Sequence, residues 1–302
     1  MNYQIISDSS CDLPTDIVET KKLIIVPFYV SFDDTHYKKE MVEVGIRDFY
    51  EEMVATPKVF PKTSLPPAQD YVDVFEPLVK AGTPIICICI STKFSGSMQS
   101  ALSAKDILLE TYPNAQITVI DATVNTVLQG QYVLEAVRMQ EAGWDYDAVV
   151  RRLEEIKSTG RIFFTVGDLE YLKHGGRIGK LAGVAASVLG IKPMITLKEG
   201  EIFPSGLARS RKKSLEKIID MLFDYLKETG KNIHTYSLSL GFGYDKEEAV
   251  TYREHFLSVV NEKLKDLIPL TTEDVPLRQI GAAISVHTGP YALGLGIIEK
   301  AF

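Results

Sequence analysis

Three short polar segments contain the side chains best suited to hold a negatively charged group. Each follows an apolar run or precedes a run with helical spacing, where backbone N–H groups are also available as hydrogen-bond donors. Hydroxyl and imidazole N–H groups can orient an anion without adding a permanent charge. The positions concerned are Thr63, Ser64, Ser95, Gly96, His287 and Thr288.

Taken singly, each segment also has an ordinary structural interpretation. Serine and threonine cap helices more often than they bind ligands, so residues 63–66 and 91–97 could simply begin helices. His287 follows the run Ala282–Val286, which we expect to be a strand, and a lone histidine after a strand is more often structural. The three segments form a site only if the fold brings them together.

Ser95 and His287 also suggest a second chemistry, with the serine as a nucleophile and the histidine as its base. That pair would make a lipid ester or thioester hydrolase. The surrounding residues disfavour it, because Phe94-Ser95-Gly96 is not a G-x-S-x-G turn and no carboxylate is apparent to orient His287. Hydrolysis is therefore the alternative function.

Motifs for metals, nucleotides and cofactors are missing from the sequence. The five histidines are scattered, and Cys87-x-Cys89 has no second pair to complete a metal site. Residues 173–180 (KHGGRIGK) look like a phosphate loop, but the glycine spacing is wrong and Leu181 stands where Ser or Thr should be. Gly241-Phe242-Gly243 lacks the third glycine of a dinucleotide motif. We expect neither metal nor cofactor.

The elements that must position these residues follow an α/β pattern, in which short apolar runs alternate with runs of helical spacing. Pro84–Ile90 is apolar throughout, as in a strand covered on both faces, and its two cysteines should face the same side. Ser214–Thr229 is the clearest helix, and Asp245 with Glu248 predicts the beginning of another. Further predicted helices are Tyr132–Met139 and Ala148–Ile156, and further predicted strands are Tyr3–Ile6, Leu23–Phe32, Gln116–Ile120, Arg161–Val166, Lys192–Leu197, Glu201–Ser205, Asn232–Leu240, Asp266–Thr271, Ala282–Val286 and Leu293–Glu299.

Length and charge limit the class of protein. A chain of 302 residues can form two domains, and the polar turn at residues 157–160 suggests domains of residues 1–160 and 161–302. A net charge of -7 argues against a nucleic-acid partner. Leu181–Ile191 is too short to span a bilayer, which needs about 20 residues, and no secretory signal is visible. The chain has three cysteines, an odd number, which argues against a disulfide framework and fits a reducing compartment. We therefore expect a cytoplasmic protein, and transient contact with a membrane is left open.

Five short motifs occur from one end of the chain to the other in the order of a known family. They are Asp8-Ser9-Ser10-Cys11-Asp12-Leu13, Thr63-Ser64-x-Pro66, Phe94-Ser95-Gly96, Leu172-x-x-Gly175-Gly176-Arg177-Ile178 and His287-x-Gly289-Pro290. Together they resemble the DegV family. The chain departs from the common pattern at Ser97, where threonine is frequent, at Thr288 in a variable place, and at Tyr291, where glycine is common.

The resemblance implies two α/β domains of the EDD type with a fatty acid in the crevice between them. It further implies a non-catalytic subunit that presents the fatty acid to a separate ATP-binding subunit of a bacterial fatty acid kinase, which makes an acyl phosphate. By resemblance, Thr63, Ser95 and His287 would hold the carboxylate. Ser64 and Gly96 would shape the loops around it, with Thr288 beside them.

Two further segments could serve such a function. The small residues of Leu181–Ile191 could leave room for an acyl chain, although tight helix packing explains them nearly as well. The basic segment 209–213 precedes a predicted helix, where positive charge opposes the helix dipole. We therefore predict that Arg177, Arg209 and Arg211 contact the kinase subunit or the transferred phosphate; a solvated basic face is the alternative.

Overall fold

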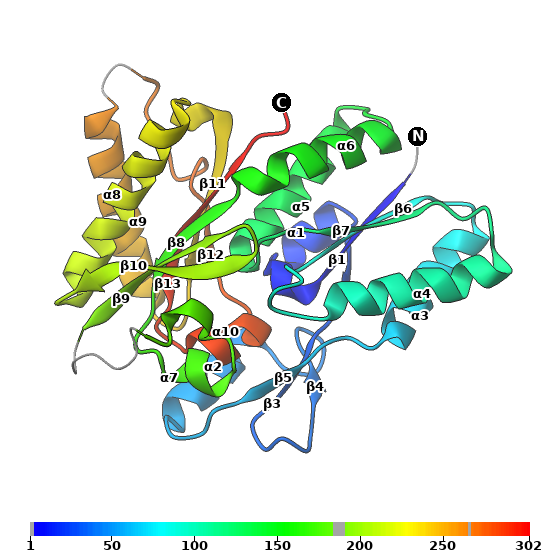
Figure 1. Ribbon diagram of the computed structural model, residues 1–302, viewed down its shortest axis with the longest axis horizontal. Helices are drawn as coiled ribbons and strands as arrows, with labels where there is room; N and C mark the ends of the chain where they lie inside the picture. Colours follow the sequence, from blue (N-terminus) through cyan, green and yellow to red (C-terminus); the bar gives the residue numbers. More distant parts are fainter. Residues whose placement is uncertain (1–2, 184–190, 265–266) are drawn as a thin grey trace.

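The computed structural model describes residues 3–183, 191–264 and 267–302 of the chain. Its named strands form three sheets (Figure 1). The first is parallel, and its strand order is β2 (Ile24–Val26), β1 (Gln4–Asp8), β6 (Ile85–Cys89) and β7 (Ile117–Asp121). It therefore contains the apolar run that was predicted to be a covered strand.

Strand β6 is buried along its whole length because helices cover both faces of the parallel sheet. Cys87 and Cys89 share one apolar cluster with α3 (Ala68–Lys80) and α4 (Ser97–Thr111). Ile86 belongs to the cluster on the other face, with α5 (Thr126–Glu141) and α6 (Tyr146–Ile156). The two cysteines are free thiols on the same face of the strand, as predicted.

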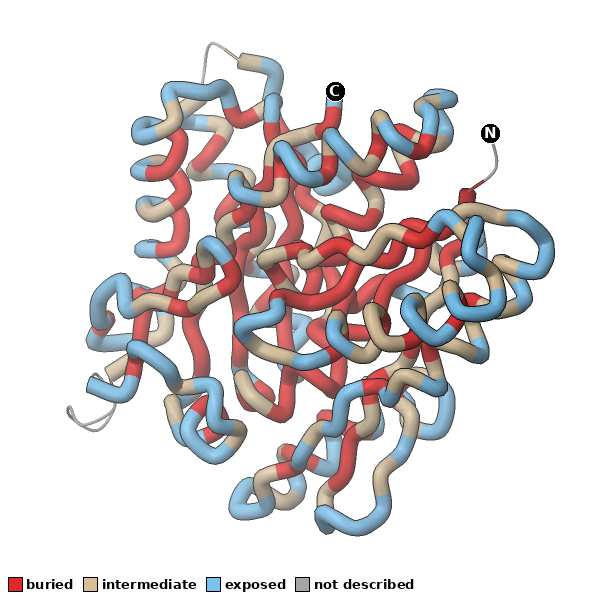
Figure 2. Tube along the Cα trace, turned by 45° about the vertical axis from the view of Figure 1, so that its right-hand side comes forward, coloured by how far each residue is buried: buried red, intermediate tan, exposed pale blue. Residues whose placement is uncertain are grey.

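The second sheet is mixed, and α5 separates it from the first. The order of its strands is β10 (Glu201–Ala208), β9 (Lys192–Lys198), β8 (Arg161–Thr165), β13 (Leu293–Glu299), β11 (Tyr236–Phe242) and β12 (Leu277–Gln279). Its neighbours run antiparallel except β11 and β12. Helices α8 (Arg211–Thr229) and α9 (Lys246–Lys263) pack on one face, while α5 contacts β11 and β13 on the other and also touches β1. Figure 2 shows the buried positions concentrated in these central strands.

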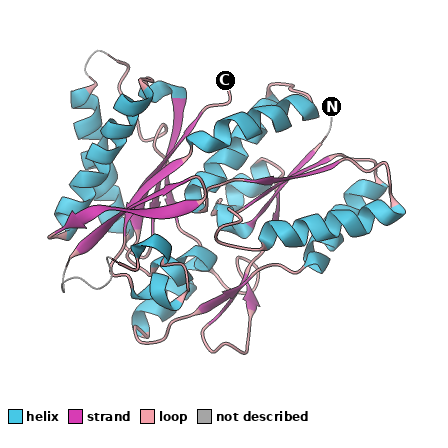
Figure 3. Cartoon of the chain, viewed as in Figure 1, coloured by secondary structure: helices cyan, strands magenta, loops and turns pink. Residues whose placement is uncertain are grey.

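The third sheet joins distant parts of the chain beneath the other two (Figure 3). It is antiparallel, with the order β4 (Lys38–Lys39), β3 (Tyr29–Ser31) and β5 (Lys62–Ser64). One apolar cluster ties it to α2 (Ile46–Ala55), α7 (Glu170–His174) and α10 (Ala282–Thr288). The small sheet therefore places the segment 62–64 beside the chain near residue 287.

Three strand predictions are wrong. Ala282–Val286 is the beginning of α10, and all five residues are buried. The spacing of apolar residues therefore could not distinguish a short apolar strand from a buried helical turn. Residues 267–271 of the predicted strand Asp266–Thr271 form no strand; the strand that pairs with β11 is β12, a few residues later. Leu23–Phe32 is divided between β2 and β3, which belong to different sheets.

The helix signals were more reliable than the short strand signals. Asp245 caps α9 by accepting a hydrogen bond from the Glu248 N–H at 2.9 Å, which confirms the predicted beginning. Helix α8 begins earlier than predicted, because Ser210 is its cap and accepts from the Lys213 N–H at 3.3 Å. Arg211 thus lies in the first turn rather than before the helix. None of the helices in the described part of the chain is both long and apolar enough to cross a bilayer.

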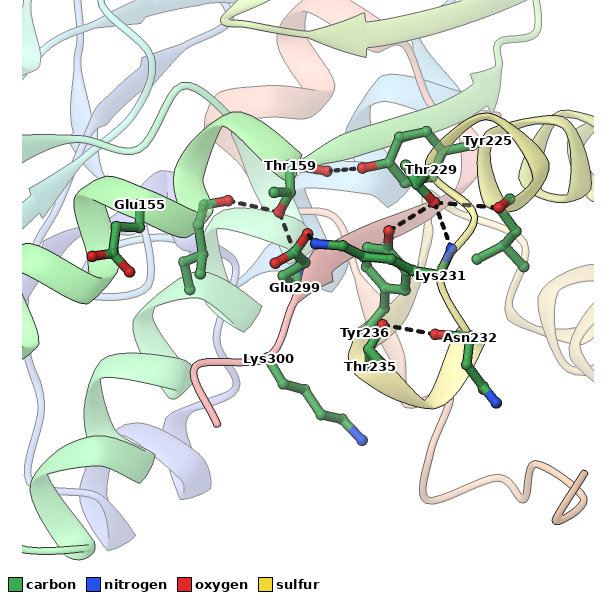
Figure 4. Close-up of polar contacts among 12 residues, drawn as sticks. Glu155, Thr159, Tyr225, Thr229, Lys231, Asn232, Thr235, Tyr236, Glu299 and Lys300 are labelled. Atoms are coloured by element: carbon green, nitrogen blue, oxygen red, sulfur yellow. Dashed lines mark hydrogen bonds and ion pairs between the residues drawn. The ribbon is translucent and has the colours of Figure 1, made fainter.

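The turn at residues 157–160, where we place the domain boundary, is tied to the second sheet (Figure 4). The Thr159 carbonyl accepts a hydrogen bond from the Tyr225 hydroxyl at 2.7 Å. The Thr159 hydroxyl accepts a second hydrogen bond, from the Glu299 N–H at 3.0 Å. Lys231 forms an ion pair with Glu299 next to this contact. The division into residues 1–160 and 161–302 remains a prediction.

Candidate ligand-binding site

A cavity of about 250 Å³ lies between the six-stranded sheet, β5 of the small sheet, and the segments that follow the strands β1, β2 and β6 of the parallel sheet. Its wall is mostly apolar and is formed by the inner face of the six-stranded sheet, the beginning of α5, and α10. Such a wall favours an apolar ligand, because burying hydrocarbon releases it from water. Large side chains that line it include Ile162, Phe164, Leu197, Ile202, Ile284 and Leu293.

Polar groups of the wall gather through a chain of contacts. Thr63 Oγ1 lies 3.2 Å from His287 Nε2, which joins β5 to the last turn of α10. Arg177 donates from Nε and Nη2 to the Phe94 carbonyl, at 3.2 and 2.9 Å, directly before Ser95. Its Nη1 donates to the Gly175 carbonyl at 2.8 Å. Ser64, Ser95 and Thr288 also line the cavity. The three segments singled out in the sequence therefore meet here.

Local structure fixes the orientation of each polar segment. Thr63 pairs with Val30 across β3 and β5, so the strand register holds its side chain on the cavity side. The Ser95 hydroxyl accepts a hydrogen bond from the Ser97 N–H at 3.2 Å, where α4 begins. Thr288 Oγ1 donates to the Ile284 carbonyl within α10 at 3.3 Å. A ligand would thus find Ser95 at the beginning of one helix and Thr288 at the end of another.

Gly175 has a packing role that explains its place in the 175–177 motif. A Cβ atom added to Gly175 would overlap the Nδ1 atom of His287. Only glycine allows the backbone of the turn after α7 to approach the imidazole this closely. The next residue, Gly176, has a φ of 67°, a left-handed conformation that also favours glycine. The motif therefore presses one loop against His287 and turns Arg177 toward the cavity.

His287 is uncharged in this setting. Burial, and secondarily the charge of Arg177, lower the pKa of its imidazole to about 4. A hydrogen bond to the Gly175 backbone acts in the opposite direction and raises this pKa, but by less than burial lowers it. A carboxylate placed next to Nε2 would favour the charged imidazolium and raise this pKa. The site can therefore take up a proton together with an acid.

The remaining predicted residues lie farther from the cavity. Gly96 precedes α4 and does not line the wall; a Cβ atom added to it would lie 3.3 Å from the Leu65 side chain, so the glycine keeps the two loops close. Arg209 is exposed just before the cap of α8. Arg211 forms an ion pair with Glu248 of α9 through two hydrogen bonds, at 2.8 and 2.7 Å, and its contact with the kinase subunit or the transferred phosphate stays a prediction. Residues 184–190 of the proposed acyl slot Leu181–Ile191 lie outside the described residues.

Several wall residues were not anticipated. Ser10 lines the cavity from the short helical turn after β1, and Asn125 and Thr126 line it from the beginning of α5. The Ser10 hydroxyl also belongs to a buried network around Asp8, whose pKa is raised by burial. The Asp8-Ser9-Ser10 motif was the signal for this region, although its position after a strand did not reveal which side chain would face a ligand.

The geometry does not assemble a serine hydrolase. His287 Nε2 contacts Thr63, and no hydrogen bond joins His287 to Ser95 among the described residues. No carboxylate of the described chain orients the imidazole through Nδ1. The described residues therefore do not form the nucleophile, base and orienting acid that a serine hydrolase uses.

The sequence matches one family along nearly its whole length. A model of the DegV family, described as an uncharacterised protein family, matches residues 2–300. A DegV domain-containing protein of Clostridium perfringens is 30% identical over 305 residues, which cover 100% of both chains. The family predicted from the five motifs is confirmed.

The fold is similar to those of solved structures that are described as binding fatty acids. A stearic acid-binding protein of Eubacterium ventriosum gives a TM-score of 0.90 at 43% identity and covers 99% of each chain. A fatty acid-binding DegV family protein of Thermus thermophilus gives 0.85 at 27% identity, covering 99% of this chain and 100% of that one. DegV of Bacillus subtilis, also a fatty acid-binding protein, gives 0.82 at 27% identity with the same coverage. The predicted α/β fold is thereby confirmed.

Proposed function

This chain belongs to the DegV family, and from that premise we propose that it binds one long-chain fatty acid without catalysing a reaction. The observation that carries the proposal is an apolar cavity whose polar groups include Thr63, Ser95 and His287. The carboxylate would lie among these donors and the alkyl chain along the wall. The fatty acids bound by the similar structures support this assignment.

The alkyl chain supplies most of the affinity. A chain with fifteen methylene or methyl carbons offers on the order of 12 kcal/mol at about 0.8 kcal/mol per buried carbon, before the cost of association. Hydrogen bonds from neutral donors add only about 1 kcal/mol each. They are still needed, because they replace the hydrogen bonds to water that the carboxylate loses when it is buried. Thr63 and Ser95 therefore select the acid over a hydrocarbon, and the wall retains it.

Binding can be tested with protein from which lipid has been removed. We expect palmitate to raise the melting temperature and native mass spectrometry to show one fatty acid per chain. Thr63→Val keeps the shape of the side chain but removes its hydroxyl, so affinity for palmitate should fall about tenfold while affinity for hexadecanol changes less. Ser100→Ala, on the outer part of α4, is the matched control. Failure of every chain length to bind would exclude the proposal.

We further propose that the bound carboxylate is presented to a separate ATP-dependent kinase subunit. Arg177 supports this role, because it lines the cavity and remains exposed. Arg209 is a second exposed cation before α8. Guanidinium groups suit the charge that develops on a transferred phosphoryl group.

A reconstituted reaction with a fatty acid kinase subunit and ATP tests the second step separately. Acyl phosphate can be trapped with hydroxylamine and counted. Arg177→Ala and Arg209→Ala should reduce its formation more than they reduce palmitate affinity, whereas Arg151→Gln, exposed on α6, should change neither. The opposite pattern, with affinity lost first, would place these arginines in the lipid cavity instead of at the kinase.

A further inference from the structure

A second cavity, of about 290 Å³, lies beside α5 but away from the fatty acid site. It is formed by α5, β11, the segment before β12, and Lys300 near the end of the chain. Helix α5 separates the two cavities, because residues 125–127 line the first and Gln131, about one turn later, lines the second. Polar side chains dominate its wall: Gln131, His234, Ser237, Asp274, Arg278 and Lys300.

Arg278 on the edge strand β12 carries a buried positive charge without a protein counter-ion. Only 6% of its surface is exposed, and no carboxylate of the described residues lies within 4.0 Å of it. Its one side-chain hydrogen bond among those residues runs from Nη1 to Gln131 Oε1, at 3.1 Å. A guanidinium group has five N–H donors, so most of the donors of Arg278 make no hydrogen bond to the described residues.

Burial lowers the pKa of Arg278 to about 10, which leaves the side chain charged at neutral pH. A buried ion without an opposite charge is costly for a fold, unless a ligand or solvent in the cavity compensates it. Glu135, one turn after Gln131 on α5, does not line the cavity and is already engaged: it accepts hydrogen bonds from Ser237 and from the Ala301 N–H, and it pairs with Arg138. The fold thus places a basic group in this cavity, and neither of the wall acids, Glu273 and Asp274, forms an ion pair with it among the described residues.

A second cation reaches the same cavity from its rim. In Figure 4 the Lys300 side chain extends away from the Lys231–Glu299 ion pair, and no ion pair involving Lys300 occurs within the described ranges. Lys300 and His234 lie close enough to Asp274 to help hold the pKa of that carboxyl below its usual value, after the hydrogen bonds from Thr271. The cavity therefore has a buried cation inside and a partly exposed cation at its entrance.

We propose that this second cavity binds one small oxyanion through its phosphate-like group, with two N–H groups of Arg278 gripping two oxygens and Lys300 closing over a third. Guanidinium matches such an oxygen pair geometrically, and a water-poor setting strengthens the contact. Glu273 and Asp274 also line the wall and repel a highly charged ligand. The site should therefore take inorganic phosphate or a small phosphate monoester in preference to a nucleotide triphosphate.

Binding of phosphate can be measured on the full chain in phosphate-free buffer by isothermal titration and by thermal unfolding. We expect one saturable site for inorganic phosphate and a higher melting temperature when it is filled. Glycerol 3-phosphate in parallel shows whether the free ion or a monoester is preferred, and ATP should bind at least about tenfold more weakly. Palmitate affinity should be the same with and without phosphate, which separates this site from the proposed lipid function.

The variants decide the assignment. Arg278→Met removes the buried charge, so it should abolish phosphate binding and leave the phosphate-free protein as stable as the parent or more stable. Lys300→Gln, at the rim, should weaken phosphate binding about tenfold without affecting the fold, and it replaces Arg278→Met as the test if that variant does not fold. Arg151→Gln removes an exposed charge elsewhere and serves as the control. The proposal would be overturned if phosphate showed no saturable binding to the parent, or if it bound equally to the parent and to Arg278→Met. If Lys300→Gln is the test, equal phosphate binding to the parent and to that variant would overturn it too.

Discussion

The uncharged state of His287 predicts a specific dependence of stability on pH. In the unfolded chain a histidine has a pKa of 6.5, whereas burial and the Arg177 charge lower the pKa of His287 to about 4 in the folded protein. Between these two values the unfolded chain binds a proton that the folded protein does not. The folded state therefore keeps its full stability above pH 6.5 and loses stability as the pH falls toward 4.

The size of this loss follows from the pKa difference. At pH 5, His287 should cost about 2 kcal/mol of the free energy of unfolding relative to pH 7.5, at about 1.4 kcal/mol per pKa unit. Buried carboxyl groups oppose the trend, because burial raises the pKa values of Asp8, Asp12 and Glu40. The difference between parent and His287→Gln removes their contribution and isolates the histidine.

Urea unfolding of lipid-free protein at pH 7.5 and pH 5 provides the measurement. Trp144 is the sole tryptophan and stacks on Phe302, so its fluorescence reports loss of the fold. The parent should lose about 2 kcal/mol more than His287→Gln between the two pH values, whereas the exposed His255→Gln should behave like the parent. Bound palmitate should reduce the loss, because its carboxylate raises the pKa of His287. Parallel pH profiles for parent and His287→Gln would refute the reasoning.

Two further predictions concern the packing around the fatty acid. Gly175→Ala places a Cβ atom against the His287 imidazole. It should lower palmitate affinity about tenfold and stability by roughly 1–3 kcal/mol, as measured by titration and urea unfolding. Leu197→Ala and Leu222→Ala both remove a buried leucine and should each destabilise the fold by about 2–5 kcal/mol. Only Leu197 lines the cavity, so only its loss should weaken palmitate binding, by about tenfold; equal affinities in the two leucine variants would contradict the placement of the alkyl chain.

Elements with a long, consistent pattern could be predicted from the sequence. Ser214–Thr229 has enough turns to show an apolar stripe, and Pro84–Ile90 is long enough to identify as a strand buried on both faces. Ala282–Val286 was misassigned because its five buried residues span little more than one helical turn and carry no polar face to set a period. His287 was therefore expected at the end of a strand, whereas it lies in the last turn of α10.

The candidate site could be predicted only as a set of residues, not as an arrangement. Thr63 and His287 are 224 positions apart, and nothing local to either one indicates that a three-residue strand and a seven-residue helix will place them in contact. The motifs identified the polar groups because their order resembles a family. The apolar wall was missed because Phe164 and Leu197 read equally well as ordinary core residues. Arg278 was missed for a similar reason, since burial of a charge depends on packing by distant elements.

The Asp8–Leu13 motif illustrates how residues can serve a site without touching its ligand. Its last acid, Asp12, meets Glu40 at Gly281, where any side chain would overlap the Asp12 carboxyl and crowd Glu40 Oε1. Burial raises the pKa of both carboxyl groups, and the charge of Glu40 raises that of Asp12 further. The pair therefore keeps a proton to a higher pH than two exposed carboxyl groups would, and the proton relieves the repulsion between two acids held in one apolar setting.

This acid pair lies where α10 begins, and α10 carries His287. Glu40 accepts hydrogen bonds from the Ala283 N–H at 3.1 Å and from the Ser9 hydroxyl at 2.6 Å, so it fastens the helix to the segment after β1. A helix of seven residues has too few internal hydrogen bonds to stand alone, and its position must come from such contacts. Burying two carboxyl groups costs stability that an apolar pair would not. That cost is understandable if the chain gains a fixed direction for α10, because the distance between His287 and Thr63 depends on it.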